Sequence, residues 1–169
     1  MKALEMLKKG EIDLIYVPEV NKYITCCGDT FYLFSERYFS KINEEDVKRY
    51  FKFELKAVLL DEDSEYNHLY LCDLIEAYNY RIEKFEKNIR NSRYTIVEYA
   101  LDDNRQIFEI EWEVKYLKSL YEKILQEKKD IMDTVNFILE DAEIVDIDDV
   151  IQEEDKQCTS TMQKESQKR

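Results

Sequence analysis

The sequence predicts an α+β fold, in which a small antiparallel sheet with short helices is followed by a long antiparallel, coiled-coil-like helical hairpin. Short β-favouring segments separated by turn residues occupy the first 60 residues. Apolar residues at heptad spacing occupy the next 80 residues. The 169-residue chain has two glycines and one proline, too few turn residues for a loop-rich sandwich or barrel.

The first elements are predicted from local stop signals. Residues 3–9 have the pattern of one or two helical turns, and Gly10 is placed to end them. Residues 12–17, Ile-Asp-Leu-Ile-Tyr-Val, predict a strand that ends at Pro18. These elements begin a small α+β unit with three or four strands.

A hairpin and a further strand complete this unit. Residues 22–27 and 30–34 flank Gly28-Asp29 and predict a β-hairpin with a tight turn. Asn43, followed by three acidic residues, predicts a helix start. Residues 51–60 alternate apolar and charged side chains and predict a strand. Its apolar face would consist of Phe51, Phe53, Leu55, Ala57 and Leu59.

Two apolar stripes predict the helical hairpin. The first consists of Leu71, Ile75, Tyr78, Ile82, Phe85 and Ile89. The second consists of Ile110, Val114, Leu117, Tyr121, Ile124, Ile131, Val135 and Ile138, interrupted at Lys128. Two arms at about 66–101 and 105–140, joined at Asp102-Asp-Asn104, would bury these stripes against each other.

The composition of residues 94–114 leaves a second interpretation open. Apolar and glutamate residues alternate from Phe108 to Val114, and residues 94–101 are rich in β-formers. A β-hairpin that turns at 102–106, between two shorter helices, would account for both features. We favour continuous helices because the second stripe keeps its register. Ser92 and Arg93 interrupt the first stripe, so the first arm is expected to bend or end there.

These patterns divide the chain into four parts. They are a small α+β unit at 1–62, a helical hairpin at 63–140, an acidic segment at 141–155 and a disordered tail at 156–169. Residues 141–151 fit either a short acidic helix or a strand. The chain from residue 152 onward lacks the apolar content needed to fold.

The net charge of −13 is concentrated in one segment. Residues 130–155 contain eleven acidic residues and no basic residue. Such a segment repels nucleic acid and anionic membranes, and it attracts basic surfaces. The charged N-terminus is unlike a signal peptide, and no apolar run approaches the roughly 18–20 residues that cross a bilayer. We therefore expect a cytoplasmic protein that binds neither nucleic acid directly nor membranes.

The usual catalytic motifs are absent from the sequence. His68 is the only histidine, and it has no nucleophile motif beside it. Two isolated glycines exclude the usual phosphate-binding loops. Asp61-x-Asp63-x-Glu65 begins like a calcium loop, but Tyr66 stands where that loop requires glycine. We expect no catalytic residue, no metal site and no cofactor, and therefore no enzyme.

The cysteines are expected to be reduced. The chain contains Cys26, Cys27, Cys72 and Cys158, with no CxxC pair. In a chain without a secretion signal this pattern indicates cytosolic thiols. Adjacent strand residues point to opposite faces, so one of Cys26 and Cys27 is expected to be buried and the other exposed.

The acidic segment and the single tryptophan are the candidate binding features. A basic groove that grips phosphates would also attract a rigid array of carboxylates. We expect partner contacts at Asp141, Glu143, Asp146, Asp148 and Asp149. Trp112 is a candidate interface anchor, and its alternative is packing between the arms.

The predicted function is non-enzymatic binding to a basic surface of another protein. The carboxylates would form a DNA-mimic surface that occupies a site meant for nucleic acid. One alternative is a structural or assembly protein that oligomerises through its helical stripes, with a homodimer as the simplest form. The other is a small-ligand sponge built on the aromatic N-terminal unit.

The opening of the chain also resembles a group of known proteins. Ala3-Leu-Glu-Met-Leu-Lys-Lys-Gly10, followed by a strand and an aromatic hairpin, is similar to the start of small accessory proteins of phages and mobile elements. Sponge proteins that counter Thoeris defence are among them. The resemblance covers roughly the first 35 residues, and this chain has no tryptophan before Trp112, unlike those sponges. The resemblance implies a phage or mobile-element protein that acts in a bacterial host cell and inhibits a host nucleic-acid-handling defence system, in the manner of an anti-CRISPR protein. It implies no binding residues.

Overall fold

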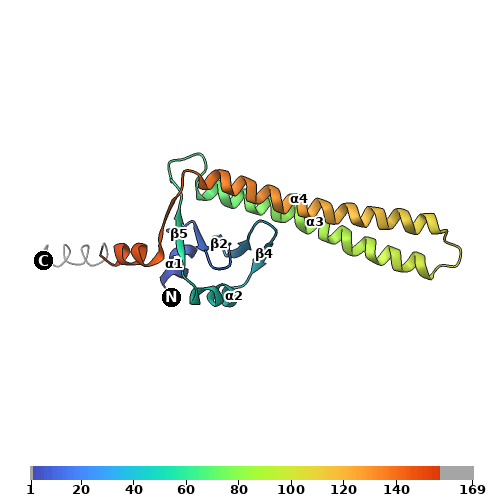
Figure 1. The fold of residues 1–169 in the computed structure, drawn as a ribbon, viewed down its shortest axis with the longest axis horizontal. Helices are drawn as coiled ribbons and strands as arrows, with labels where there is room; N and C mark the ends of the chain where they lie inside the picture. The colour runs from blue at the N-terminus through green and yellow to red at the C-terminus, as the bar shows by residue number, and fades with distance from the viewer. Residues whose placement is uncertain (1, 157–169) are drawn as a thin grey trace. The chain divides into compact units, whose positions relative to one another are not determined.

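The computed structural model describes residues 2–156 and confirms the α+β class, with an antiparallel sheet, short helices and a long helical hairpin (Figure 1). The chain forms two compact units. The sheet unit comprises the residues up to Cys72 together with those from Asn136 onward, and the hairpin unit comprises Asp73–Val135.

The sheet has six antiparallel strands in the order β4-β3-β2-β1-β5-β6. They are β1 (Leu14–Val17), β2 (Lys22–Cys27), β3 (Thr30–Phe34), β4 (Phe39–Ile42), β5 (Lys56–Leu59) and β6 (Glu143–Asp146). The sequence predicted three or four strands. The two strands at the ends of this order, β4 and β6, are only four residues long, and their side chains are partly exposed, so their patterns are weak.

The predicted β2–β3 hairpin is confirmed. Cys27 pairs with Thr30, and Gly28 has φ +62°, which glycine adopts without the steric cost of a side chain. Because alternate residues point to opposite faces, Ile24 and Cys26 pack in the core on one face, whereas Cys27 points to the other.

The strand predicted over residues 51–60 is wrong in length. Arg49–Lys52 forms a 3-10 helix, η1, and β5 covers only Lys56–Leu59. The Phe53 backbone N–H donates to the Tyr50 carbonyl at 3.1 Å, which keeps this segment in a helical turn. Phe51 and Phe53 still pack against the core, so the alternating pattern reflects their burial without strand pairing.

Two short helices contribute to the core of the sheet unit. α1 (Lys2–Lys8) packs through Leu4 and Leu7, and Gly10 follows it with φ +75°. α2 (Glu44–Lys48) packs through Val47 and begins at the predicted Asn43 cap. The Asn43 Oδ1 accepts a hydrogen bond from the Asp46 backbone N–H at 2.8 Å.

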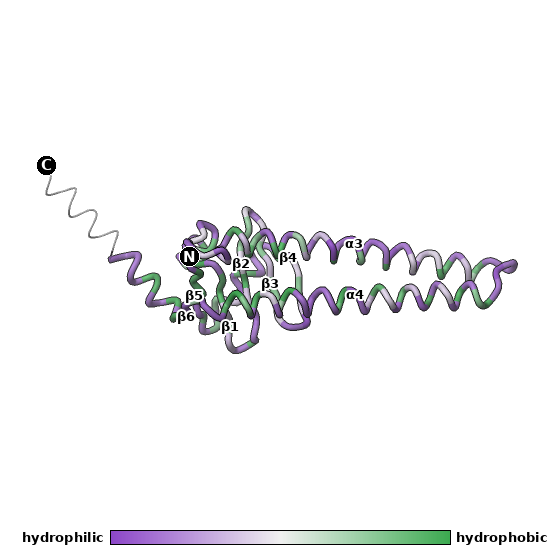
Figure 2. Tube along the Cα trace, turned by 90° about the horizontal axis from the view of Figure 1, so that it is seen from above, coloured by the Kyte–Doolittle hydropathy of each residue, from purple (hydrophilic) through white to green (hydrophobic). Residues whose placement is uncertain are grey.

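The helical hairpin consists of α3 (His68–Leu101) and α4 (Ile107–Leu139). Both helices are continuous, so the β-hairpin interpretation of 94–114 is wrong, and the first arm does not end at Ser92. Hydrophobic and hydrophilic residues alternate along both helices at short intervals (Figure 2). This pattern is what two amphipathic helices need in order to bury one stripe each.

Most of the predicted stripe residues are buried, with one correction. Ile82, Ile89, Ile124 and Ile131 are all less than a tenth exposed. In the middle of α4, however, Leu120 is 1% exposed, whereas the predicted Tyr121 is 45% exposed. Leu120 therefore takes the place of Tyr121 in the buried stripe at this one turn, and the predicted Ile124 and Ile131 are buried beyond it.

The acidic segment is ordered within the described residues. It forms β6, which pairs with β5, and residues 147–156 are helical. The open choice between strand and helix thus resolves into one of each, and the segment belongs to the sheet unit. The tail predicted to be disordered lies, except for residue 156, outside the described residues. No helix within residues 2–156 is both long enough and apolar enough to cross a membrane.

Candidate functional site

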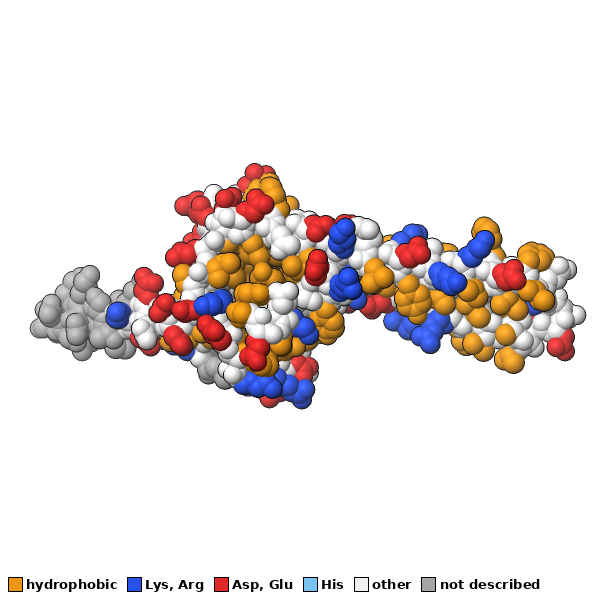
Figure 3. Space-filling view, viewed as in Figure 1, with side chains coloured by type: hydrophobic (Ala, Val, Ile, Leu, Met, Phe, Trp, Pro, Cys, Tyr) orange, Lys and Arg blue, Asp and Glu red, His pale blue; other side chains and the backbone are white. Residues whose placement is uncertain are grey.

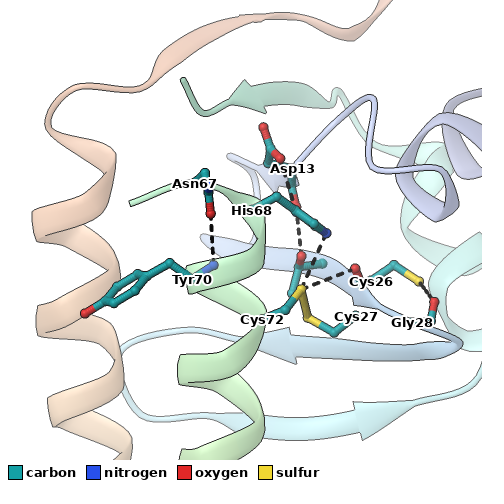
Figure 4. The surroundings of a disulfide bond; sticks show 9 residues. Asp13, Cys26, Cys27, Gly28, Asn67, His68, Tyr70 and Cys72 are labelled. Atoms are coloured by element: carbon teal, nitrogen blue, oxygen red, sulfur yellow. Dashed lines mark hydrogen bonds and ion pairs between the residues drawn. A yellow bond between two sulfur atoms is a disulfide. The ribbon is translucent and has the colours of Figure 1, made fainter. Parts of the chain in front are cut away.

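Cys27 and Cys72 form a disulfide in the sheet unit (Figure 4). Cys27 ends β2, Cys72 lies in the first turns of α3, and their Cα atoms are 5.4 Å apart. The prediction of reduced thiols is therefore wrong for these two residues. The expectation of one exposed thiol is also wrong, since Cys26 and Cys27 are each only 3% exposed.

His68 lies beside the disulfide, on the side of Cys72. Cys72 follows His68 by four positions, which places both side chains on one face of α3. The His68 Nε2 is 3.4 Å from the Cys72 Sγ, and Figure 4 shows the imidazole between this sulfur and Asp13. Asn67 caps the helix, because its Oδ1 accepts from the Tyr70 backbone N–H at 3.1 Å. The cap holds the first turn that carries His68.

Asp13 faces the other ring nitrogen of His68. The Asp13 Oδ1 is 3.1 Å from the His68 Nδ1. The Nδ1 makes no hydrogen bond of good geometry, so this contact is electrostatic and strongest when the imidazole is protonated. Asp13 is itself anchored, since its Oδ2 accepts from the Leu60 backbone N–H at 2.7 Å and its carbonyl accepts from the Thr25 hydroxyl at 2.8 Å.

Cys26 is the free cysteine among those described, and it belongs to a different environment. Its side chain lies in the core on the sheet face opposite Cys27, with its Sγ 3.2 Å from the Gly28 carbonyl. Burial raises the pKa of the Cys26 thiol, and the charge of Asp29 adds to this shift. A buried thiol that favours its neutral form is a poor nucleophile.

Cys72, His68 and Asp13 lie in contact in that order, an arrangement suited to proton transfer. The sequence did not predict it. When the disulfide is reduced, an imidazole in contact with the Cys72 thiol can take up its proton, and a fixed carboxylate stabilises the imidazolium that results. The signal present in the sequence was the spacing of four between His68 and Cys72 on a predicted helix. Asp13 carried no such signal, because it joins the site only through the sheet.

A second feature lies at the loop end of the hairpin unit. Six large apolar side chains near the α3–α4 connection are each more than half exposed. We call them the loop-end surface: Tyr94, Val97, Leu101, Ile107, Phe108 and Trp112. Figure 3 shows hydrophobic side chains over much of the visible face of this half of the hairpin. Exposed aromatic and aliphatic residues at this density are typical of interaction sites.

Trp112 is exposed rather than packed between the arms. It is 73% exposed and borders a surface depression together with Tyr99 and Phe108. Its charged lining consists of three carboxylates, at Glu109, Glu111 and Glu113, and one cation, at Lys115. Residues 94–116 contain six acidic and two basic residues. An apolar floor with an acidic rim favours a ligand that carries both apolar and basic groups.

The five acidic residues predicted to contact a partner all lie in the sheet unit, at separate places. Asp146 forms an ion pair with Lys56 on β5. Glu143 and Asp146 are three residues apart on β6, so their side chains point to opposite faces. Asp148 and Asp149 are exposed in the helical segment that follows, and Asp141 is exposed before β6. The five carboxylates thus do not share one face, and Trp112 belongs to the hairpin unit.

The described residues contain no group of three or more metal-capable side chains close enough to hold an ion. In the segment that begins like a calcium loop, the Asp61 carboxylate accepts from the Asp63 backbone N–H at 3.0 Å. That contact is a local turn of the chain.

No protein-family model, curated protein or solved structure matches this chain.

Proposed function

We propose that the protein is a non-enzymatic binding module whose loop-end surface engages a basic, partly apolar surface of another protein. The observation that carries this proposal is the exposure of six large apolar side chains at the end of a helical hairpin. Interface hot spots are enriched in tryptophan and tyrosine, and a central aromatic anchor contributes much of the binding energy. Trp112 is that anchor in this proposal.

The acidic rim supports the choice of a basic partner. Glu109, Glu111 and Glu113 lie beside Trp112, and Arg105 is already paired with Asp102 and Glu109. An incoming lysine or arginine would therefore meet net negative charge around an apolar floor. Nucleic-acid-handling enzymes have such basic grooves, so inhibition of a host defence enzyme of this class remains the proposed biological role.

The burial of the two apolar stripes favours the binding-module proposal over oligomerisation through these stripes. Ile82, Ile89 and Ile124 are already buried within the hairpin, so these stripes are not available for oligomerisation. A homodimer would have to use the loop-end surface or another exposed face. Size measurement by light scattering at several concentrations separates the two alternatives.

The test uses Trp112 as a fluorescent reporter, because it is the single tryptophan. The protein is titrated with an amphipathic helical peptide of lysine and leucine, and with an analogue in which glutamate replaces lysine. The basic peptide is expected to shift the emission to shorter wavelength, with an affinity that falls as salt rises. An equal response to both peptides, or no response to either, would overturn the proposed surface.

Two matched sets of charge-neutralising substitutions test which carboxylates contribute to binding of the basic peptide. The loop-end set is Glu109→Gln, Glu111→Gln and Glu113→Gln. The sheet-unit set is Asp141→Asn, Glu143→Gln and Asp148→Asn, with the same change in net charge. We expect the first set to weaken binding of the basic peptide and the second to leave it nearly unchanged. The reverse result would indicate that the acidic segment, and not the loop-end surface, contacts the basic peptide.

A natural partner is identified by affinity capture from a bacterial lysate and is then purified. Trp112→Ser is expected to weaken its binding by about 30-fold or more. The control is Tyr80→Ser, which removes another exposed aromatic residue of the hairpin unit. A partner that binds Trp112→Ser as tightly as the wild type would contradict the proposal.

A groove on the sheet unit favours the small-ligand alternative as a second candidate function. It is lined by Lys22, Arg49 and Lys52 together with Tyr38 and Tyr50. Cationic side chains beside aromatic rings suit an anionic ligand with a flat ring system. Mass spectrometry of the protein purified without denaturation tests this function, and a stoichiometric anionic ligand lost in Arg49→Gln would support it.

A further inference from the structure

We propose that Cys27 and Cys72 form a reversible thiol–disulfide site that exchanges with small-molecule thiols and disulfides of the glutathione class. His68 serves as the proton carrier of the site, and Asp13 positions His68. The site lies wholly within the sheet unit, so it is independent of the loop-end surface in the hairpin unit.

The geometry distinguishes the two sulfurs. Cys72 is the more exposed, at 8% against 3% for Cys27, and it is the one in contact with His68 at 3.4 Å. The His68 side chain is 30% exposed, so solvent reaches the site through the imidazole. In the reduced protein, Cys72 as a thiolate beside an imidazolium is the expected nucleophile, and Cys27 is the resolving thiol.

The oxidation balances in two steps. The Cys72 proton moves to the His68 Nε2, and the Cys72 thiolate attacks one sulfur of the small disulfide. The bond in that disulfide breaks, and the first small thiolate leaves with the proton from His68. Cys27 then attacks the Cys72 Sγ, the second small thiolate leaves, and it takes up the proton of Cys27. Two electrons thus pass from the cysteines to the small disulfide, which becomes two thiols.

Asp13 acts through His68 and not on the sulfur. Its Oδ1 is 3.1 Å from the Nδ1, and its other oxygen is held by the Leu60 backbone N–H. The groups that face the imidazole are thus the carboxylate before β1 and the sulfur of α3. This contact holds the imidazole with its Nε2 toward the Cys72 sulfur, where it can take up the thiol proton after reduction.

The experiment uses the full chain in mixtures of reduced and oxidised glutathione, quenched with acid and analysed by mass spectrometry. Cys26→Ser is present in every variant, because the adjacent Cys26 and Cys27 fall in one peptide. We expect the Cys27–Cys72 bond to form and break as the mixture changes. In Cys27→Ser, a mixed disulfide with glutathione should accumulate on Cys72, while Cys72→Ser should place far less on Cys27.

The role of His68 is tested by the rate at which iodoacetamide alkylates the reduced Cys72 in Cys27→Ser. We expect His68→Gln to slow alkylation at neutral pH about tenfold, and to move the rate profile to higher pH. Asp13→Asn should shift the profile in the same direction by less. Circular dichroism of each variant shows whether the sheet unit remains folded.

Two results would overturn the proposal. One is a Cys27–Cys72 bond that does not change between strongly reducing and strongly oxidising glutathione in the folded protein. The other is a folded His68→Gln variant whose alkylation rate and pH profile match those of the parent. If His68→Gln does not fold, Asp13→Asn provides the test in its place. An alkylation pH profile of folded Asp13→Asn that matches the parent's would equally exclude the proton-carrier arrangement.

Discussion

The Ser92 hydroxyl donates a hydrogen bond to the Glu113 carboxylate across the hairpin at 2.9 Å. Ser92 is 3% exposed, so this polar residue occupies a position in the buried stripe of α3. Because the hydroxyl is removed from water, it needs an acceptor within the protein, and the Glu113 carboxylate supplies it. Ser92 therefore interrupts the apolar pattern because it forms a hydrogen bond to the other helix. It does not end α3.

Replacement of Glu113 by Ala is expected to destabilise the hairpin by about 1 kcal/mol, because it removes the acceptor of a buried hydroxyl. The value lies toward the low end of the usual range, since a helical serine can turn to a carbonyl of its own helix. Amide hydrogen exchange of the hairpin measures the effect. Glu111→Ala removes the same charge from an exposed neighbour and should be nearly neutral; an equal loss in both variants would contradict the prediction.

Leu120→Ala is expected to cost about 2–5 kcal/mol in the stability of the hairpin unit, because it leaves a cavity at a fully buried position. Tyr121→Ala, at the position that heptad spacing assigns to the stripe, should cost far less because Tyr121 is 45% exposed. Hydrogen exchange again measures the hairpin, since the two units need not unfold together. A larger cost at Tyr121 would restore the original register.

Lys8 and Glu44 are expected to make folding stability depend on pH at both extremes. Their side chains meet at 2.7 Å, and this hydrogen bond raises the pKa of Lys8 and lowers the pKa of Glu44. The stabilisation is present between the ordinary pKa values, roughly pH 4 to 10. It is lost as pH falls through the lowered pKa of Glu44, and as pH rises through the raised pKa of Lys8.

Chemical denaturation of the wild type and of Glu44→Gln as a function of pH measures this contribution. The two proteins should differ near neutral pH and converge in acid, where Glu44 is protonated. Both side chains are more than 40% exposed, so the difference should be small and should shrink in high salt. A difference that grows as the pH falls would have the wrong sign for this pair.

Trp112 should be accessible to acrylamide in the folded protein, because its side chain is 73% exposed. Its fluorescence quenching is expected to approach that of the urea-unfolded chain. Shielding that disappears on dilution would show that a second copy covers the loop-end surface, and shielding at every concentration would contradict the exposed position of Trp112.

The helical hairpin was predictable because its signals are local. Heptad spacing from Leu71 to Ile89 indicates a buried stripe without knowledge of what covers it. The β2–β3 turn is likewise encoded by Gly28-Asp29 alone. The error at Leu120 is confined to one turn of α4, because Ile124 and Ile131 are buried where heptad spacing places them.

The candidate site was less predictable. Trp112 was recognised as an anchor from its type, but its exposure depends on which face of α4 meets α3. The spacing of His68 and Cys72 was visible, whereas the bond from Cys72 to Cys27 joins residues 45 positions apart. Cysteine pairing cannot be read from spacing, because it requires the two Cα atoms to approach to bonding distance.

The sequence by itself determined the helices, the tight turn and the concentration of negative charge, since each depends on neighbours within a few residues. The tertiary structure alone decided that β6 completes the sheet beside β5, so that the acidic segment is dispersed over two faces. It also decided that Asp13, Cys27, His68 and Cys72 meet. The physical reason is the same in both cases: strand pairing brings together residues that are distant in the chain, and no local pattern specifies which distant segment supplies the hydrogen bonds.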